Sequence, residues 1–543
     1  MGINSRLSLT RSKKTVALYT RVTKSVLGIV LGLWLVSMIH DYSIRLATSH
    51  SDTALFLEMT SQWSGRGVGE SQMVNAISAV YNYLGPLPVV EICQKLATPI
   101  EVIRVDVFSI HPYLISEPLS LVGQLTHLPT HIWGAFLMVS SVLIGLVYIV
   151  RFMREVDIHM VLVLGMLPVV MTFPVLTLSL LGQAYFDRLL FGPAVVLMLG
   201  LYRLHRSIEV NTWSQVASVV ALTVISERGA LLAALLGCVY NLLLNGRGVF
   251  RRGTSRKVFA FGLVSLVYSL IYLLFFANFA TGGTSPTDIQ TRIQSIIDSP
   301  FNLVTFLWMS SPLLLLATCS GRTFAVVLTS LVPNVLVTIG GAELTGFTTH
   351  YHQFYLPVLS CGAVIGMSRI LSSVTAKGSQ LRIFCIQFVV VASTCLGSYA
   401  VWNLLAVNRG VAAPLASAQR VWIPFSPLAT AERSVRQSFL ADARKLLEPT
   451  GTSPNLSVSL PEGFFSAAYV SSELKFFYWP MGVGASDFVI APISSGKPVM
   501  FPHGDVFGKE AELASCVVAI LRDRYVLVGE NLDGGLRLYK RAS

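Results

Sequence analysis

The stretch "WSQVASVVALTVISERGALLAALLGCVYNLLLNGRG", residues 213–248, is apolar except for one polar cluster near its centre. It begins beside one short basic loop and ends beside another, so its two ends belong on the same side of a membrane. The run is long enough for two short helices that turn back between those loops. We therefore predict a turn at Ser226, Glu227 and Arg228, buried where protein or a wet cavity satisfies its polar groups.

The composition around this stretch indicates an α-helical polytopic membrane protein. Of the 543 residues, 53% are apolar and only 13% are charged, and the mean hydropathy is +0.64. A soluble protein of this length needs far more charge to cover its surface. The first apolar run, about Val26–Ile39, lacks a small-x-small cleavage site, so we interpret it as a retained helix.

The net charge of +12 is concentrated in short loops beside apolar runs. Basic residues precede the first helix at Arg6, Arg11, Lys13, Lys14, Arg21 and Lys24, and crowd one later loop at Arg247, Arg251, Arg252, Arg256 and Lys257. Such loops are typical of the cytoplasmic face of a membrane protein rather than of nucleic-acid binding. The seven cysteines show no CxxC spacing, and we expect neither a zinc site nor a disulfide framework.

With a cytoplasmic N-terminus, the apolar runs give about eleven transmembrane helices and leave every dense basic loop on one side. Besides the first run and the pair in 213–248, the expected helices are about 132–150, 159–181, 189–202, 258–278, 303–318, 324–339, 354–370 and 383–405. We expect a basic cytoplasmic N-terminus over 1–25, a transmembrane domain over 26–406 with a long first outer loop at 43–130, and an extracytoplasmic domain over 407–543. This predicts a multi-pass protein of the inner (cytoplasmic) membrane.

The last part of the chain has the pattern of a small α/β domain. Short strands separated by Pro, Gly and Ser are expected in "NLSVSLP", "SAAYVSS", "KFFYWP", "SDFVIAPI", "YVLVGENL" and "GLRLYKR". The segment "AERSVRQSFLADARKLLEP" (431–449) predicts an amphipathic helix closed by proline. In the outer loop, "ALFLEMTSQW" (54–63) predicts a helix at the membrane interface.

The predicted topology brings a set of polar residues to the outer surface from different helices and loops. They are Asp52, His111, Asp187, Glu227, Arg228, Glu343, His350 and His352. Most have a simpler interpretation as turn caps or interfacial anchors. Glu227 stands apart, because a carboxylate inside a long apolar run is expensive unless it is paired or functional; the alternative is a structural ion pair with Arg228.

Carboxylates, imidazoles and an arginine at a lipid–water boundary suit chemistry on a lipid-linked anion. Arginine or histidine can hold a phosphate, and a carboxylate can take a proton from an acceptor hydroxyl. The sequence does not identify a cofactor. Hard oxygen ligands would suit a divalent metal such as magnesium or manganese, but no spacing here defines a metal site.

The order of these segments resembles a bacterial and archaeal membrane family known only as domain of unknown function 2079. The resemblance is carried by "HSDTALFLEMTSQWSGRG", "SIHPYLISEPLSLVGQLTHLP", "SERGALL", "THYHQFYLPVL", and the tail strands "SDFVIAPI" and "LDGGLRLYKR". It covers nearly the whole chain with loose motifs. Two motifs depart from the family pattern: "SERG" has Arg228 at an acidic position, and "GQAYFDR" replaces the usual Asp-Phe-His-Pro.

That family is similar in layout to the C-fold (GT-C) glycosyltransferases, membrane enzymes that use polyprenyl-phosphate sugars. The resemblance implies that Asp52 is the catalytic base. Arg228, His350 and His352 are then candidate phosphate holders, and Glu227, Asp187 and His111 could orient them or hold a metal.

Three functions are compatible with these features. The first is a glycosyltransferase that moves a sugar from a polyprenyl-phosphate donor to a glycan, lipid or protein acceptor outside the membrane. The second is a transporter or flippase of a lipid-linked or anionic solute, although we find no internal repeat. The third is a non-catalytic envelope assembly factor. All three involve membrane lipid, and none involves nucleic acid.

Overall fold

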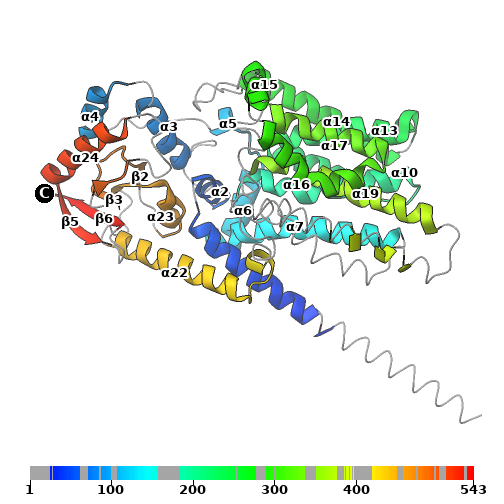
Figure 1. Cartoon of the computed structure of the whole chain (residues 1–543), viewed down its shortest axis with the longest axis horizontal. Coiled ribbons are helices and arrows are strands. Elements are labelled where there is room, and N and C mark those ends of the chain that lie inside the picture. The colour runs from blue at the N-terminus through cyan, green and yellow to red at the C-terminus, as the bar shows by residue number, and fades with distance from the viewer. Residues whose placement is uncertain are drawn as a thin grey trace, which may run out of the picture.

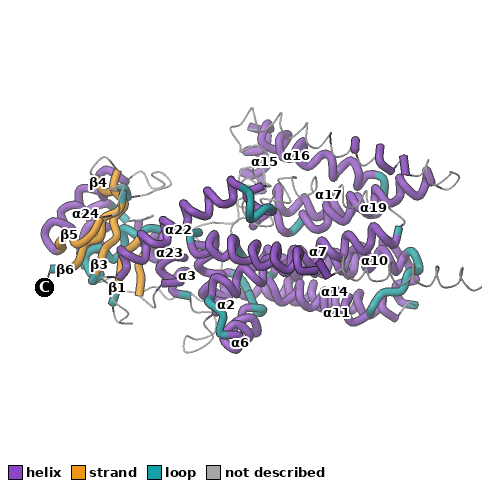
Figure 2. Tube along the Cα trace, turned by 90° about the horizontal axis from the view of Figure 1, so that it is seen from below, coloured by secondary structure: helices purple, strands orange, loops and turns teal. Residues whose placement is uncertain are grey.

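The structure, a computed structural model, places a helical bundle at one end of the molecule and a β-sheet at the other (Figures 1 and 2). It describes residues 25–26, 28–49, 51–61, 71–84, 87–98, 107–156, 184–251, 253–276, 289–298, 300–336, 350–375, short pieces between 384 and 396, 419–448, 456–471, 475–494, 497–500, 509–530 and 535–542.

Five of the described helices are long and apolar enough to cross a membrane. They are the N-terminal helix Gly28–Ala47, α7 (Thr130–Glu155), η1 with α10 (Phe186–His205), α12 to η3 (Glu227–Phe250), and α14 with η4 (Gly253–Phe276). These helices support the expected membrane class, whereas the expected eleven spans are not confirmed. The predicted helix at 159–181 lies outside the described residues, and most of the one at 383–405 does too.

Further helices complete the bundle. They are α11 (Thr212–Ile225), α15 (Ile289–Asp298), α16 (Pro300–Thr318), α17 (Gly321–Leu336), η6 (His350–Gln353) and α19 (Leu356–Thr375). Among these, α11 and parts of α17 and α19 are apolar helices shorter than the five candidate spans.

The run at 213–248 breaks at Ser226, as its sequence predicts. Helix α11 ends at Ile225, Ser226 is extended (φ −166°, ψ 169°), and α12 (Glu227–Ala234) begins at the next residue. The Ser226 side chain accepts a hydrogen bond from the Gly229 backbone N–H at 3.1 Å and so caps α12. The second half then continues through η2 (Leu235–Tyr240), α13 (Asn241–Asn245) and η3 (Gly246–Phe250).

Gly229 allows the two halves of the broken run to approach closely. A Cβ atom at this position would overlap the backbone carbonyl oxygen of Leu222 in α11 and crowd a methyl group of Leu190. Only glycine fits this contact without moving a helix. The sharp turn therefore depends on the small residue that follows Arg228.

Two side-chain contacts join helix α7 to the helix η1–α10. Glu155, the last residue of α7, forms an ion pair at 2.7 Å with Arg203, which lies in the last turn of α10. Near the middle of α7, Ser141 donates a hydrogen bond at 2.9 Å to the carbonyl oxygen of Leu189, at the start of η1–α10. The 20 residues of Phe186–His205 span about 30 Å. Asp187 and Arg203 therefore lie near opposite ends of this candidate membrane span.

The predicted first outer loop is largely helical. It contains α2 (Ser51–Ser61), α3 (Gln72–Leu84), α4 (Val89–Ala97), α5 (Val107–Ile110) and α6 (Ser116–Thr126). The helix expected at 54–63 corresponds to α2. Glu58 of this helix accepts hydrogen bonds from the Ser71 hydroxyl at 2.6 Å and the Gln72 backbone N–H at 2.8 Å. A carboxylate at the start of α3 satisfies N–H groups that the helix itself leaves open.

The C-terminal region forms a six-stranded sheet with strand order β2-β1-β3-β6-β5 and β4 paired to β3. The strands are β1 (Ser457–Leu460), β2 (Lys475–Tyr478), β3 (Phe488–Ser494), β4 (Lys497–Pro498), β5 (Tyr525–Glu530) and β6 (Leu536–Arg541). Strand β1 is parallel to β2 and β3, whereas β6 is antiparallel to β3 and β5. Helices α22 (Pro427–Leu447), η8 (Glu462–Phe464), α23 (Phe465–Ser471) and α24 (Glu510–Arg524) accompany the sheet.

One expected strand is wrong. Residues 466–471 of the segment "SAAYVSS" lie in α23 (Phe465–Ser471), a short helix that follows η8, and not in the sheet. Its buried residues Phe465, Ala467 and Ala468 belong to the same hydrophobic core as residues of α2. The β-branched and aromatic residues that suggested a strand are thus outweighed by the packing of a helix against the outer loop.

A disulfide between Cys93 and Cys516 corrects our expectation that the cysteines are not paired. Cys93 lies in α4 of the outer loop and Cys516 in α24 of the C-terminal region, two helices that lie next to each other in Figure 1. The Gly484 N–H also donates to the Leu96 carbonyl oxygen at 2.8 Å. The sequence separation of 423 residues hides this pairing from any local cysteine pattern.

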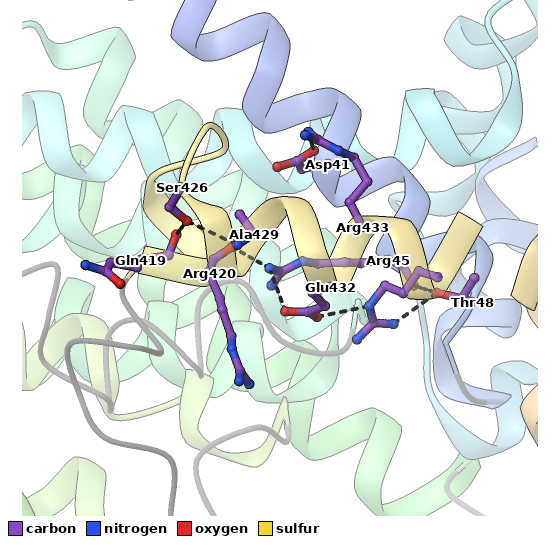
Figure 3. Close-up of polar contacts among 10 residues, drawn as sticks. Asp41, Arg45, Thr48, Gln419, Arg420, Ser426, Ala429, Glu432 and Arg433 are labelled. Atoms are coloured by element: carbon purple, nitrogen blue, oxygen red, sulfur yellow. Dashed lines mark hydrogen bonds and ion pairs between the residues drawn. The ribbon is translucent and has the colours of Figure 1, made fainter. Parts of the chain in front are cut away.

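Helix α22 runs beside the N-terminal helix and joins it through charged side chains (Figure 3). Arg433 pairs with Asp41 at 2.5 Å, and Glu432 pairs with Arg45 at 3.4 Å. Four residues after Glu432, Arg436 donates a hydrogen bond to the Thr48 hydroxyl at 2.9 Å. We call these contacts the α22 clasp. They attach the C-terminal region to the segment directly before α2.

Candidate functional site

An ion pair between Asp187 and Arg228 joins the break at Ser226 to the start of the helix η1–α10. Arg228 Nη1 lies 2.8 Å from Asp187 Oδ2, and the Ser226 hydroxyl donates to Asp187 Oδ1 at 2.6 Å. The Asp187 side chain is 3% exposed, whereas that of Arg228 is 30% exposed. Asp187 is therefore a buried anchor, and Arg228 is the member of the pair that a ligand can reach.

The main partner of Glu227 is His111, and not Arg228, the residue next to it in the sequence. Its Oε1 lies 2.9 Å from His111 Nδ1. The same oxygen lies 3.9 Å from Arg228 Nε, so Arg228 is the more distant of its two partners. The segment after His111 is held in place because the Ile115 N–H donates to the Val224 carbonyl oxygen at 2.8 Å. Four of the residues predicted from the sequence thus form one connected network: His111, Asp187, Glu227 and Arg228.

Asp52 lies in the first turn of α2, is half-buried, and interacts electrostatically with His111 and Arg228 of this network. The adjacent residue, Thr53, accepts a hydrogen bond from the Ala184 N–H at 3.2 Å, which ties α2 to the segment leading into Asp187. Burial, and after it the negative charge of Glu462, raise the pKa of Asp52 to about 6. The charges of His111, Arg188 and Arg228 lower the pKa of Asp52.

Two residues that complete this environment were not predicted from the sequence. Arg188 is 1% exposed and interacts electrostatically with Asp52. It follows Asp187 directly in the sequence. Glu462 lies in η8 of the C-terminal region, and its Oε2 accepts a hydrogen bond from the Tyr478 hydroxyl at 2.9 Å. Nothing in "PEGFF" indicates that this glutamate lies near an aspartate 410 positions earlier in the chain.

Aromatic rings form one wall of the site. Tyr113 stacks on Phe186 with 4.4 Å between ring centroids, and Tyr185 lies edge-on to Tyr113 at 5.7 Å. Burial raises the pKa of both tyrosines well above the ordinary value, so their hydroxyls are neutral at physiological pH. The ring of His111 lies 5.3 Å from that of Tyr113. These rings exclude water from one side of the charged network and strengthen its electrostatic interactions.

Of the remaining predicted residues, His352 lies in η6, which packs against η1, the element that carries Asp187. His352 is buried in η6, and its Nδ1 lies 2.8 Å from the Tyr355 hydroxyl. The His350 side chain and the whole of Glu343 lie outside the described residues. The roles expected for His350 and His352 therefore rest on the sequence alone. Within the described parts of the chain, no three His, Cys, Asp or Glu side chains come together as a set of metal ligands.

The structure is that of a helical membrane protein with a C-terminal α/β region and a charged network at one end of the helical bundle. No family model and no curated protein matches the chain, so the resemblance to family 2079 is not confirmed.

Among solved structures, the chain is similar to ArnT from Cupriavidus metallidurans bound to undecaprenyl phosphate, with a TM-score of 0.46 and 11% identity over 95% of this chain and 98% of that one. The apo state of ArnT from the same organism gives 0.46 and 11% over 96% and 98%. The arabinofuranosyltransferase AftD from Mycobacteria gives 0.39 and 12%, over 91% of this chain but only 39% of that one. We rest the functional proposal below on the residues of this chain.

Proposed function

We propose that this protein is an integral-membrane glycosyltransferase that moves a sugar from a polyprenyl-phosphate donor to an acceptor hydroxyl at the outer membrane surface. One observation carries the proposal. The half-buried Asp52 interacts electrostatically with His111 and Arg228, which belong with Glu227 and Asp187 to one partly exposed charged network at one end of the helical bundle. Base and cation are thus close together at the depth where a lipid headgroup meets water.

Asp52 has the properties of the base. Its pKa of about 6 lies near neutral pH, where a base is most effective because it is ionised yet still binds a proton well. In the proposed reaction Asp52 takes the proton of the acceptor hydroxyl, and the acceptor oxygen forms a bond to the anomeric carbon of the sugar. The bond from that carbon to the phosphate oxygen breaks, and its electron pair leaves with the polyprenyl phosphate.

Arg228 is the proposed contact to the donor phosphate. Asp187 holds one of its terminal nitrogens, and the side chain is still 30% exposed. Guanidinium groups bind phosphate through several N–H donors in one plane. Asp187, Glu227 and His111 then act as positioning residues, because they fix the orientation of Arg228 before the donor arrives.

We also propose the orientation of the protein from the position of its charges. Arg203 lies in the last turn of α10 and Arg247 in η3, at the end of the bundle away from Asp187. The positive-inside rule places those basic ends in the cytoplasm. Asp52, Glu227 and the region 407–543 then face the extracytoplasmic side, and the N-terminus is cytoplasmic.

The direct test uses purified protein in proteoliposomes with synthetic polyprenyl-phosphate mannose, glucose and arabinose, each radiolabelled in the sugar. The wild-type protein should release or transfer the label from at least one donor. Arg228→Ala should weaken donor binding by about 10-fold or more, the scale for losing a hydrogen bond to a charged group. Arg251→Ala, at the opposite end of the bundle, serves as the control. Movement of intact donor across the bilayer without cleavage of the sugar–phosphate bond would instead identify a transporter.

A further inference from the structure

Only one of the two carboxylate oxygens of Glu227 has a hydrogen-bond partner among the described residues. Its Oε1 binds His111, but its Oε2 is buried and has no hydrogen-bond partner among the described residues. The residue as a whole is only 8% exposed. Leaving a buried carboxylate oxygen without a donor is costly, so such an atom usually meets a ligand or an ordered water.

A second orphaned group lies on the neighbouring helix. The Tyr268 hydroxyl of α14 is buried and has no hydrogen-bond partner in the described part of the chain. It is close enough to Glu227 for the two to interact electrostatically. The position of Tyr268 is fixed one helical turn earlier, where the hydroxyls of Ser265 and Thr223 lie 2.7 Å apart. Thr223 lies in the last turn of α11, and Glu227 begins α12 after the break at Ser226, so this contact brings α14 close to the segment that carries Glu227.

The chemistry of these two atoms restricts what can bind them together. An ionised carboxylate oxygen only accepts hydrogen bonds, so its partner must be a donor. A tyrosine hydroxyl both donates and accepts. A phosphate ester has no N–H or O–H to offer Glu227 when it is fully ionised, and it would be repelled by the carboxylate. A hydroxyl group, in contrast, can donate to Glu227 Oε2 and accept from Tyr268.

We propose that Glu227 and Tyr268 form a subsite for a hydroxyl group of the donor's sugar, separate from the phosphate contact at Arg228. This proposal rests on the proposed glycosyltransferase function and deepens it. It assigns Glu227 two tasks, because Oε1 orients His111 while Oε2 binds the sugar. It also assigns a binding role to Tyr268, which lies in α14, one of the candidate membrane spans.

The test compares two kinds of ligand and three variants. The ligands are polyprenyl phosphate alone and the same lipid carrying mannose, glucose or arabinose, with dissociation constants measured on purified protein. The sugar should increase the affinity of the wild-type protein for at least one donor. Tyr268→Phe removes only the hydroxyl, and should weaken binding of that donor by about three- to tenfold without changing the affinity for polyprenyl phosphate alone.

Two controls separate this subsite from the proposed function as a whole. Tyr240→Phe removes a tyrosine hydroxyl whose partner is Thr323, at 3.3 Å in another part of the bundle, and should change neither affinity. Arg228→Ala should weaken both ligands. If the wild-type protein bound neither ligand, the proposed function itself would be wrong.

Three results would overturn the subsite while leaving the function intact. The first is equal wild-type affinity for polyprenyl phosphate with and without each sugar. The second is a Tyr268→Phe protein with unchanged affinity for the sugar-bearing donor, because the hydroxyl would then bind only a structural water. The third is an equal loss for both ligands, which would place Tyr268 at the phosphate.

Discussion

Arg228 Nη1 and Asp187 Oδ2, separated by 2.8 Å, connect the broken helix at Ser226 to the first turn of the helix η1–α10. The polar side chains of two segments within largely apolar stretches therefore bind each other. The same pair leaves Arg228 partly exposed beside Asp52, so the contact that stabilises the break also positions the proposed phosphate contact.

Asp187→Ala should lower the free energy of unfolding by about 2 kcal/mol, because it leaves Arg228 without its carboxylate in a largely buried place. Asp187→Asn keeps an acceptor for the Ser226 hydroxyl and should cost less. Thermal unfolding in detergent compares the two variants with Asp523→Asn, which alters an exposed pair with Arg522. Equal melting temperatures for all three would show that the Asp187–Arg228 pair contributes nothing to stability.

The disulfide between Cys93 and Cys516 predicts that the outer loop and the C-terminal region share an oxidising compartment. Peptide mapping of protein from membranes, without reduction, should recover the cross-linked pair. Cys93→Ser should lower stability by about 2–5 kcal/mol, whereas Cys319→Ser, at an exposed free cysteine, should not. Recovery of both thiols in the free form would contradict the pairing and the proposed location of region 407–543.

The α22 clasp predicts that Arg433 helps to hold the C-terminal region against the bundle. Arg433→Ala leaves Asp41, whose side chain is 10% exposed, without its ion pair and should destabilise the attachment by about 1–2 kcal/mol. The expected result is faster release of the C-terminal region by added trypsin. Arg522→Ala, at a 77% exposed arginine, is the matched control. Identical digestion of both variants would mean that other contacts hold the region.

The charge of Glu462 should set the pH dependence of the reaction. Asp52 acts as a base only when ionised, so activity should fall as the pH drops through about 6. Glu462 raises the pKa of Asp52, so Glu462→Gln should lower it and move the acidic limb of the kcat/KM profile to lower pH. Glu530→Gln, in the same region, should leave the limb in place. An unmoved limb in Glu462→Gln would show that this glutamate does not act on Asp52.

The features that follow from local sequence were predictable. The break at Ser226 follows from charge inside an apolar run, and strands β1, β2, β3, β5 and β6 follow from short alternating segments between turn residues. Topology then indicated that Asp187, Glu227 and Arg228 approach one another. The pairing of these side chains could not be predicted. Glu227 binds His111, and Arg228 binds Asp187.

The features that depend on contacts distant in sequence were missed. Cys93 and Cys516 carry no spacing signal, because the pairing arises only when α4 and α24 pack together. Glu462 reaches the site of Asp52 because η8 and α23 fold as helices against the outer loop, where the sequence suggested a strand. Such placements are decided by tertiary packing, which overrides local preference.

The transfer rate of the Asp52→Asn protein tests the central claim most directly. The substitution keeps the size and polarity of the side chain but removes the proton acceptor, so donor binding and membrane insertion should be retained. Single-turnover transfer of radiolabelled sugar at pH 7.5 should fall by about 100-fold or more relative to the wild-type protein and to Asp523→Asn. A parental transfer rate in Asp52→Asn would contradict the account and leave Asp52 as an anchor at the membrane interface.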